Sequence, residues 1–89
     1  MMKIEFLGQA QNADDGGVIF EAKVDGNMIK CHFTFEALEE IDPDNFQDLP
    51  LKQFQDHKLK LLSIAENKIQ RGLFANGHLS IFTSDLQLD

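Results

Sequence analysis

The chain has 89 residues, of which 43% are apolar, and a net charge of −7. This length suits one hydrophobic core, so residues 1–89 are expected to form a single domain without a second one. One cysteine excludes an internal disulfide, and the lack of an apolar N-terminal run favours a cytoplasmic protein without a membrane segment. The excess of acids disfavours nucleic acid and anionic membranes as partners.

Residues 3–7 are expected to form a short first strand, and residues 8–17 a polar loop rich in turn formers. The next segment, V-I-F-E-A-K-V-D-G-N-M-I-K-C-H-F-T at residues 18–34, predicts a hairpin. Its turn is expected at Asp25-Gly26, since both residues accept a positive φ. A turn at Gly26-Asn27 is the alternative, but it would place Lys23 opposite Lys30. The Asp25-Gly26 turn predicts one apolar face, formed by the pairs Ala22 with Ile29, Phe20 with Cys31, and Val18 with Phe33.

Two helices are expected after the hairpin. Thr34 can cap a short helix over residues 35–41, which Asp42-Pro43 ends. A main helix of about twenty residues is expected to open at residues 48–50 and to end at Gly72. Its apolar stripe carries Lys58 in the middle and consists of Leu51, Phe54, Leu61, Leu62, Ala65 and Ile69.

A last strand is predicted at residues 78–83, after an Asn76-Gly77 turn, with Leu79 and Ile81 facing inward. The element order is therefore β-β-β-α-α-β. We predict an α+β fold, a two-layer sandwich in which a mainly antiparallel sheet of about four strands carries two helices on one face.

Three segments carry a family resemblance: V-D-G-N-M-I-K-C-H-F-T-F-E-A-L, F-Q-D-H-K-L-K-L-L-S-I-A-E-N-K and N-G-H-L-S-I-F-T-S-D. Together they resemble the small bacterial family called domain of unknown function 1488. The resemblance covers nearly the whole chain. It implies a compact α+β domain with no established activity, ligand or catalytic residue. The positions that match its pattern are Asp25, Gly26, Cys31, Ala37, Leu38, Phe54, His57, Lys58, Ala65 and Lys68.

The sequence predicts neither a catalytic site nor a cofactor. Cys31 and His32 are adjacent in a strand, so their side chains point to opposite faces, and Cys31 is interpreted as a core residue with His32 on the solvated face. The aspartates of residues 42–48 lack the glycine and the final glutamate of a calcium loop, and the three histidines lack zinc-ligand spacing.

Lys58 offers a hypothesis of its own, since a lysine on an apolar stripe must snorkel or find a carboxylate. It could pair with an acid of residues 36–48 and so join the two helices, or it could reach solvent along the surface.

The leading functional prediction is a non-enzymatic module that binds a protein partner or a second copy through the acidic segment or the open sheet face. One alternative is a regulatory protein that contacts nucleic acid through the basic helix, and another is an enzyme or small-ligand binder centred on His57. The interaction candidates are Glu36, Glu39, Glu40, Asp42, Asp44, His32, His57, Lys58, Lys60 and Lys68.

Overall fold

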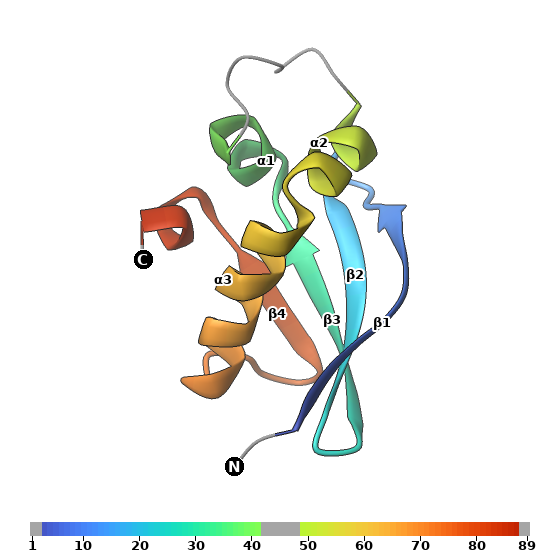
Figure 1. Ribbon diagram of the computed structural model, residues 1–89, viewed down its shortest axis with the longest axis vertical. Helices are drawn as coiled ribbons and strands as arrows, with labels where there is room; N and C mark the ends of the chain where they lie inside the picture. Colours follow the sequence, from blue (N-terminus) through green and yellow to red (C-terminus); the bar gives the residue numbers. More distant parts are fainter. Residues whose placement is uncertain (1–2, 42–48, 88–89) are drawn as a thin grey trace.

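The computed structural model describes residues 3–41 and 49–87. Within them, a four-stranded sheet in the order β1-β2-β3-β4 packs against three α-helices (Figure 1). This arrangement confirms the predicted α+β class. The elements are β1 (Ile4–Asn12), β2 (Val18–Val24), β3 (Asn27–Phe33), α1 (Phe35–Ile41), α2 (Pro50–Asp56), α3 (Lys58–Gln70), β4 (His78–Ile81) and the 3₁₀ helix η2 (Thr83–Gln87).

The hairpin of β2 and β3 has the predicted turn and register. Asp25 and Gly26 both adopt positive φ, at 51° and 88°, and Phe20 lies opposite Cys31. The inward side chains of both strands are buried, and the outward ones face away from the helices. The two-residue turn is enough to determine which face enters the core.

The outer strands occupy the two edges of the sheet. β1 pairs antiparallel with β2 and continues to Asn12, beyond the predicted end at residue 7, with an irregularity between Leu7 and Gln11. β4 pairs with β3 in parallel, and α1, α2 and α3 provide the long crossover that a parallel pair requires. The sheet is therefore mixed, and among its described strands only the β3–β4 pair is parallel.

The prediction of one long helix over residues 48–71 is wrong, because His57 separates α2 from α3. Its φ of −121° is not helical, although its N–H still bonds to the carbonyls of Gln53 and Phe54. A straight helix would hold Lys58 in the middle of the buried stripe, where an unpaired charge is costly. In the broken helix, Lys58 is half-buried and its ammonium lies 5.1 Å from the centre of the Phe20 ring.

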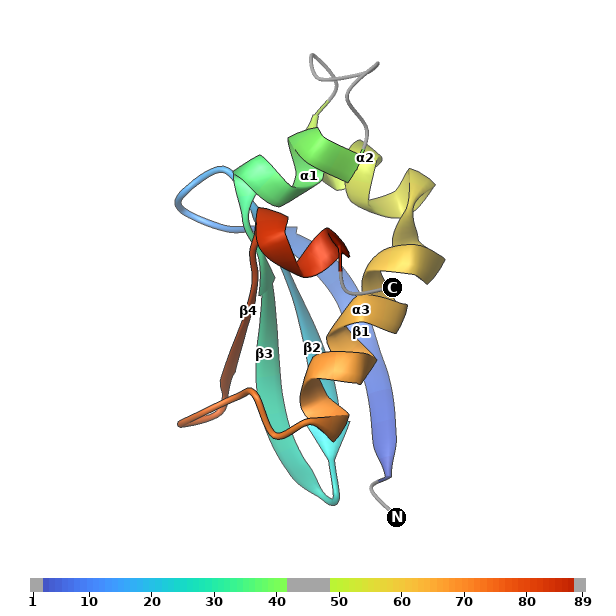
Figure 2. The same cartoon turned by 90° about the vertical axis from the view of Figure 1, so that its left-hand side faces the viewer.

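All three helices lie on one side of the sheet, with α3 across it and α1 and α2 near one end (Figure 2). Their apolar side chains meet those of the strands in one core, which includes the contacting rings of Phe20, Phe33 and Phe54. On the described residues, the opposite face of the sheet carries no helix. We call it the open face.

Candidate functional site

The open face brings together polar side chains from three strands and one turn. Lys30 lies opposite Glu21 on β2 and opposite His78 on β4, so the three form one row across the sheet. His32 lies one row further along β3, and Met28 one row back. We define the open-face site as Asp15, Glu21, Met28, Lys30, His32 and His78.

Asp15 joins the turn at residues 13–17 to this face. Its carboxylate accepts hydrogen bonds from the Gly17 N–H at 2.9 Å and from His32 Nε2 at 3.0 Å. The Gly17 bond, followed by the His32 bond, lowers the pKa of Asp15 below its ordinary value of 3.8. Gly17 is itself required there, because a Cβ at this position would collide with the carbonyl oxygen of Phe33.

The interpretation of His32 as solvated surface is therefore only partly right. The side chain does point to the open face, but only 20% of it is exposed and it pairs with Asp15. This contact was not predictable from the sequence, since the two residues lie 17 positions apart in different elements.

This pairing yields a test of pH dependence. Folding lowers the pKa of Asp15, so the charged carboxylate stabilises the folded state. This stabilisation is fully present above the pKa of Asp15 in the unfolded chain, near 4, and is lost as the pH falls through its pKa in the folded state. We therefore expect Asp15→Asn to show a smaller drop in Tm between pH 6 and pH 3 than the wild type, measured by circular dichroism. Asp14→Asn, in the same turn, serves as the control and should keep the wild-type drop. Equal drops in all three proteins would contradict the assignment.

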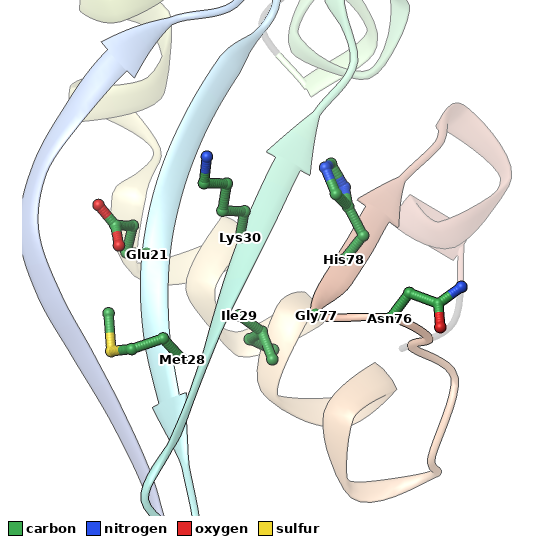
Figure 3. Close-up of a pocket in the computed structure, with 7 residues that line it drawn as sticks. All are labelled: Glu21, Met28, Ile29, Lys30, Asn76, Gly77 and His78. Atoms are coloured by element: carbon green, nitrogen blue, oxygen red, sulfur yellow. The ribbon is translucent and has the colours of Figure 1, made fainter.

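Two shallow hollows lie on the open face and share His78. The first, of about 370 Å³, is bordered by Met28, Lys30 and His78, with Gly77 supplying no side chain to fill it (Figure 3). The second, of about 260 Å³, is bordered by Asp15, His32 and His78, among others. In Figure 3 the side chains of Lys30 and His78 stand on neighbouring strands, whereas the buried Ile29 is directed toward the helices. Both hollows open to solvent, so they suit contact with a surface more than enclosure of a small molecule.

The acidic candidates on α1 lie away from this site. Glu36 and Glu40 are exposed and Glu39 is half-buried. Asp42 and Asp44 lie outside the described residues.

The basic face predicted for the main helix loses one of its members. Lys68 is buried, and its ammonium donates to the carboxylate of Asp85 at 2.8 Å and to the carbonyl of Ser80 at 2.7 Å. The prediction that Lys68 is available for an interaction is therefore wrong. His57 sits at the helix break and Lys60 is exposed on α3, so the basic residues do not share one regular helical face.

Lys58 was expected either to pair with an acid of residues 36–48 or to reach solvent along the surface. No ion pair joins Lys58 to Glu36, Glu39 or Glu40, the acids of residues 36–48 that the structure describes. Instead, the ammonium lies over the ring of Phe20 at the margin of the helix layer.

Cys31 is a core residue, as predicted. Its side chain is fully buried, and burial raises the pKa of the thiol to about 12. The thiolate needed for nucleophilic chemistry is therefore scarce at neutral pH. Within residues 3–41 and 49–87, no three His, Cys, Asp or Glu side chains lie close enough together to hold a metal ion.

A family model described as "Protein of unknown function (DUF1488)" matches residues 4–81, from the start of β1 to the end of β4. The chain belongs to the DUF1488 family. A solved structure of a DUF1488 protein of unknown function from Shewanella loihica PV-4 has the same fold, with a TM-score of 0.76 and 23% sequence identity. The alignment covers 88% of this chain and 90% of the Shewanella chain.

Among curated proteins, none matches this DUF1488 chain. The family assignment confirms the resemblance noted in the sequence and brings no activity with it. In the described part of this DUF1488 chain, the helices are too short or too polar to cross a bilayer.

Proposed function

We propose that this DUF1488 chain is a non-enzymatic protein-binding module, and that it holds its partner on the open face. One observation carries the proposal. The uncovered face exposes 49% of Met28 directly beside Lys30, which makes no ion pair within the described residues. An exposed apolar side chain beside a lysine that makes no ion pair is a combination that a partner can recognise.

The chemistry of this surface specifies the partner. Met28 offers a flexible thioether that adapts to an apolar side chain, and Lys30 offers an ammonium to a carboxylate. We therefore expect the partner to be a protein that presents an acidic side chain next to an apolar one. The chain is acidic overall, with 15 acids against 8 bases, so the exposed ammonium of Lys30 would distinguish this face from the acidic α1.

Two alternatives receive less support. Contact with nucleic acid through the main helix would lack Lys68, which Asp85 holds in the interior. A ligand site centred on His57 would need a cavity beside it, and His57 does not line the hollows beside β3 and β4. A cytoplasmic location belongs to the proposal, because a single unpaired cysteine suits a reducing compartment.

The test is a capture experiment with matched charge reversals. Tagged wild type and the Met28→Glu/Lys30→Glu variant are used on lysate of the source organism, and captured proteins are quantified by mass spectrometry. We expect the partner to be depleted about tenfold or more by the open-face variant, since both a central apolar contact and a charge are lost. The protein identified is then purified and its Kd measured for each variant.

Two further variants locate the surface. Leu59→Glu/Lys60→Glu makes the same chemical change on α3, where Leu59 is 87% exposed, and should leave capture unchanged. Glu39→Lys/Glu40→Lys tests the acidic α1. Loss of the partner from this last variant alone would move the proposal to the acidic surface. Retention of the partner by the Met28→Glu/Lys30→Glu variant would refute binding at the open face.

A further inference from the structure

The two edges of the sheet differ in whether their backbone groups are occupied. Along β4, Ala75 and His78 exchange two hydrogen bonds, at 3.0 Å and 2.9 Å. The Ser80 carbonyl accepts from Lys68 at 2.7 Å, and the Phe82 N–H donates to Asp85 at 2.7 Å. These backbone groups alternate along β4 with the ones bonded to β3, so they are directed outward from the sheet. This edge is therefore blocked against another strand.

The edge formed by β1 has no such protection. The Lys3 carbonyl accepts from the Asp25 N–H at 2.9 Å. In an antiparallel pair the bonded residues alternate, so the backbone N–H and C=O of Glu5 point toward β2, and the backbone N–H and C=O of Ile4 and Phe6 point outward. Within the described residues, no hydrogen bond reaches Ile4 or Phe6 from the outer side. A regular stretch, residues 4–7, precedes the irregularity in the strand.

The side chains beside this edge form an apolar shelf. Ile4 and Phe6 point to the core side and are only partly buried, and the Phe6 ring lies 6.3 Å from the ring of Phe20. α2 lies near the C-terminal end of β1 (Figure 1). The ammonium of Lys58 lies 5.1 Å from the centre of the same Phe20 ring, with no carboxylate partner among the described residues.

We propose that the outer edge of β1 binds an extended segment of a partner protein, which pairs with residues 4–7 as a fifth strand. The segment places apolar side chains at alternate positions against Ile4 and Phe6, and it carries an acidic residue that reaches Lys58. The proposal goes beyond binding at the open face, because it concerns a separate surface and a separate set of residues.

The positive charge of Lys58 beside the apolar shelf favours a segment of another protein over a second copy of this chain. The core-facing residues of β1 that pack against the core are Ile4, Phe6 and Ala10, none of them acidic. Two copies paired through β1 would therefore leave both Lys58 ammonium groups without a carboxylate. A foreign strand with one acid on that face supplies what is missing.

The test begins with a displayed library of random twelve-residue peptides, selected on the immobilised full chain. We expect the enriched peptides to share alternating apolar residues and an acidic residue. Their Kd is then measured by fluorescence anisotropy for wild type and for two variants at one position. Ile4→Pro removes the outward N–H and leaves the β2 hydrogen bonds in place, and Ile4→Ala removes the side chain alone. We expect Ile4→Pro to weaken binding about tenfold more than Ile4→Ala does.

A second measurement leaves the protein unchanged, so it remains decisive if Ile4→Pro unfolds. N-methylation at alternate amides of a selected peptide should abolish binding in one of the two alternations only, because a strand pairs through every second residue. Lys58→Gln should weaken binding of the acidic peptide, and it should leave unchanged the binding of the same peptide with glutamine in place of the acid. Failure to enrich any peptide, or equal binding of both methylated forms, would overturn the proposal. A dimer in solution that Ile4→Pro dissociates would overturn it in favour of a second copy.

Discussion

Replacing Lys68 with alanine is expected to lower the free energy of unfolding by about 3–5 kcal/mol, because Asp85 is left as a buried charge without its partner. The two side chains are only 9% and 12% exposed, and their atoms approach to 2.8 Å. The same ammonium caps the Ser80 carbonyl, so the substitution also frees an edge group of β4. Urea unfolding followed by far-ultraviolet circular dichroism measures the change, since the chain has no Trp or Tyr.

The chain contains a matched control for this prediction. Lys52 and Asp56 also form a Lys–Asp pair, at 3.0 Å, but their side chains are 60% and 46% exposed. Lys52→Ala should cost about 0.5 kcal/mol or less, as exposed helical pairs do. Similar losses from Lys52→Ala and Lys68→Ala would contradict the structural role assigned to the buried pair.

The double variant Lys68→Met/Asp85→Leu separates the charge from the packing. It should recover part of the stability lost in Lys68→Ala, since no buried charge remains. Recovery is expected to be incomplete, because the Phe82 N–H and the Ser80 carbonyl lose their partners.

Replacing Phe54 with alanine is expected to lower the free energy of unfolding by about 3–5 kcal/mol, through lost apolar burial and the cavity left behind. Phe54 is fully buried, and its ring centre lies 5.5 Å from that of Phe20 and 5.1 Å from that of Phe33. It thereby attaches α2 to the two central strands.

Chemical unfolding again provides the measurement, with Phe35→Ala as the control. Phe35 is 38% exposed at the start of α1, so its removal should cost clearly less. Phe54→Leu should fall between the wild type and Phe54→Ala, because it keeps part of the apolar volume. A cost for Phe54→Ala no larger than that for Phe35→Ala would show that the ring cluster does not anchor α2.

The hairpin and the helix ends were predictable because their signals are local. A two-residue turn at Asp25-Gly26 and strict alternation are sufficient for the register of β2 and β3. Thr34 caps α1 by accepting a hydrogen bond from the Ala37 N–H at 3.2 Å, as expected. Gly72, at φ 72°, follows α3, and the Leu73 N–H returns to the Lys68 carbonyl at 3.0 Å, so Gly72 ends the helix as predicted.

The break at His57 could not be predicted in the same way. Residues 51–70 carry a continuous helical stripe, and no proline or glycine lies among them to mark a break. At the break, Lys58 lies over the ring of Phe20, and Phe20 belongs to a strand more than thirty residues earlier in the chain. Helical periodicity contains no information about that contact.

By itself, then, the sequence determined the class of fold, the face of each hairpin strand that enters the core, and the burial of Cys31. These follow from turn chemistry and from the period of apolar residues, both of which act over a few neighbouring positions. Only the tertiary structure decided that His78 stands beside Lys30, that Asp15 holds His32, and that Asp85 withdraws Lys68 from the surface. Each of these three pairs joins residues from different elements, so the two side chains come together only when the sheet and helices have packed.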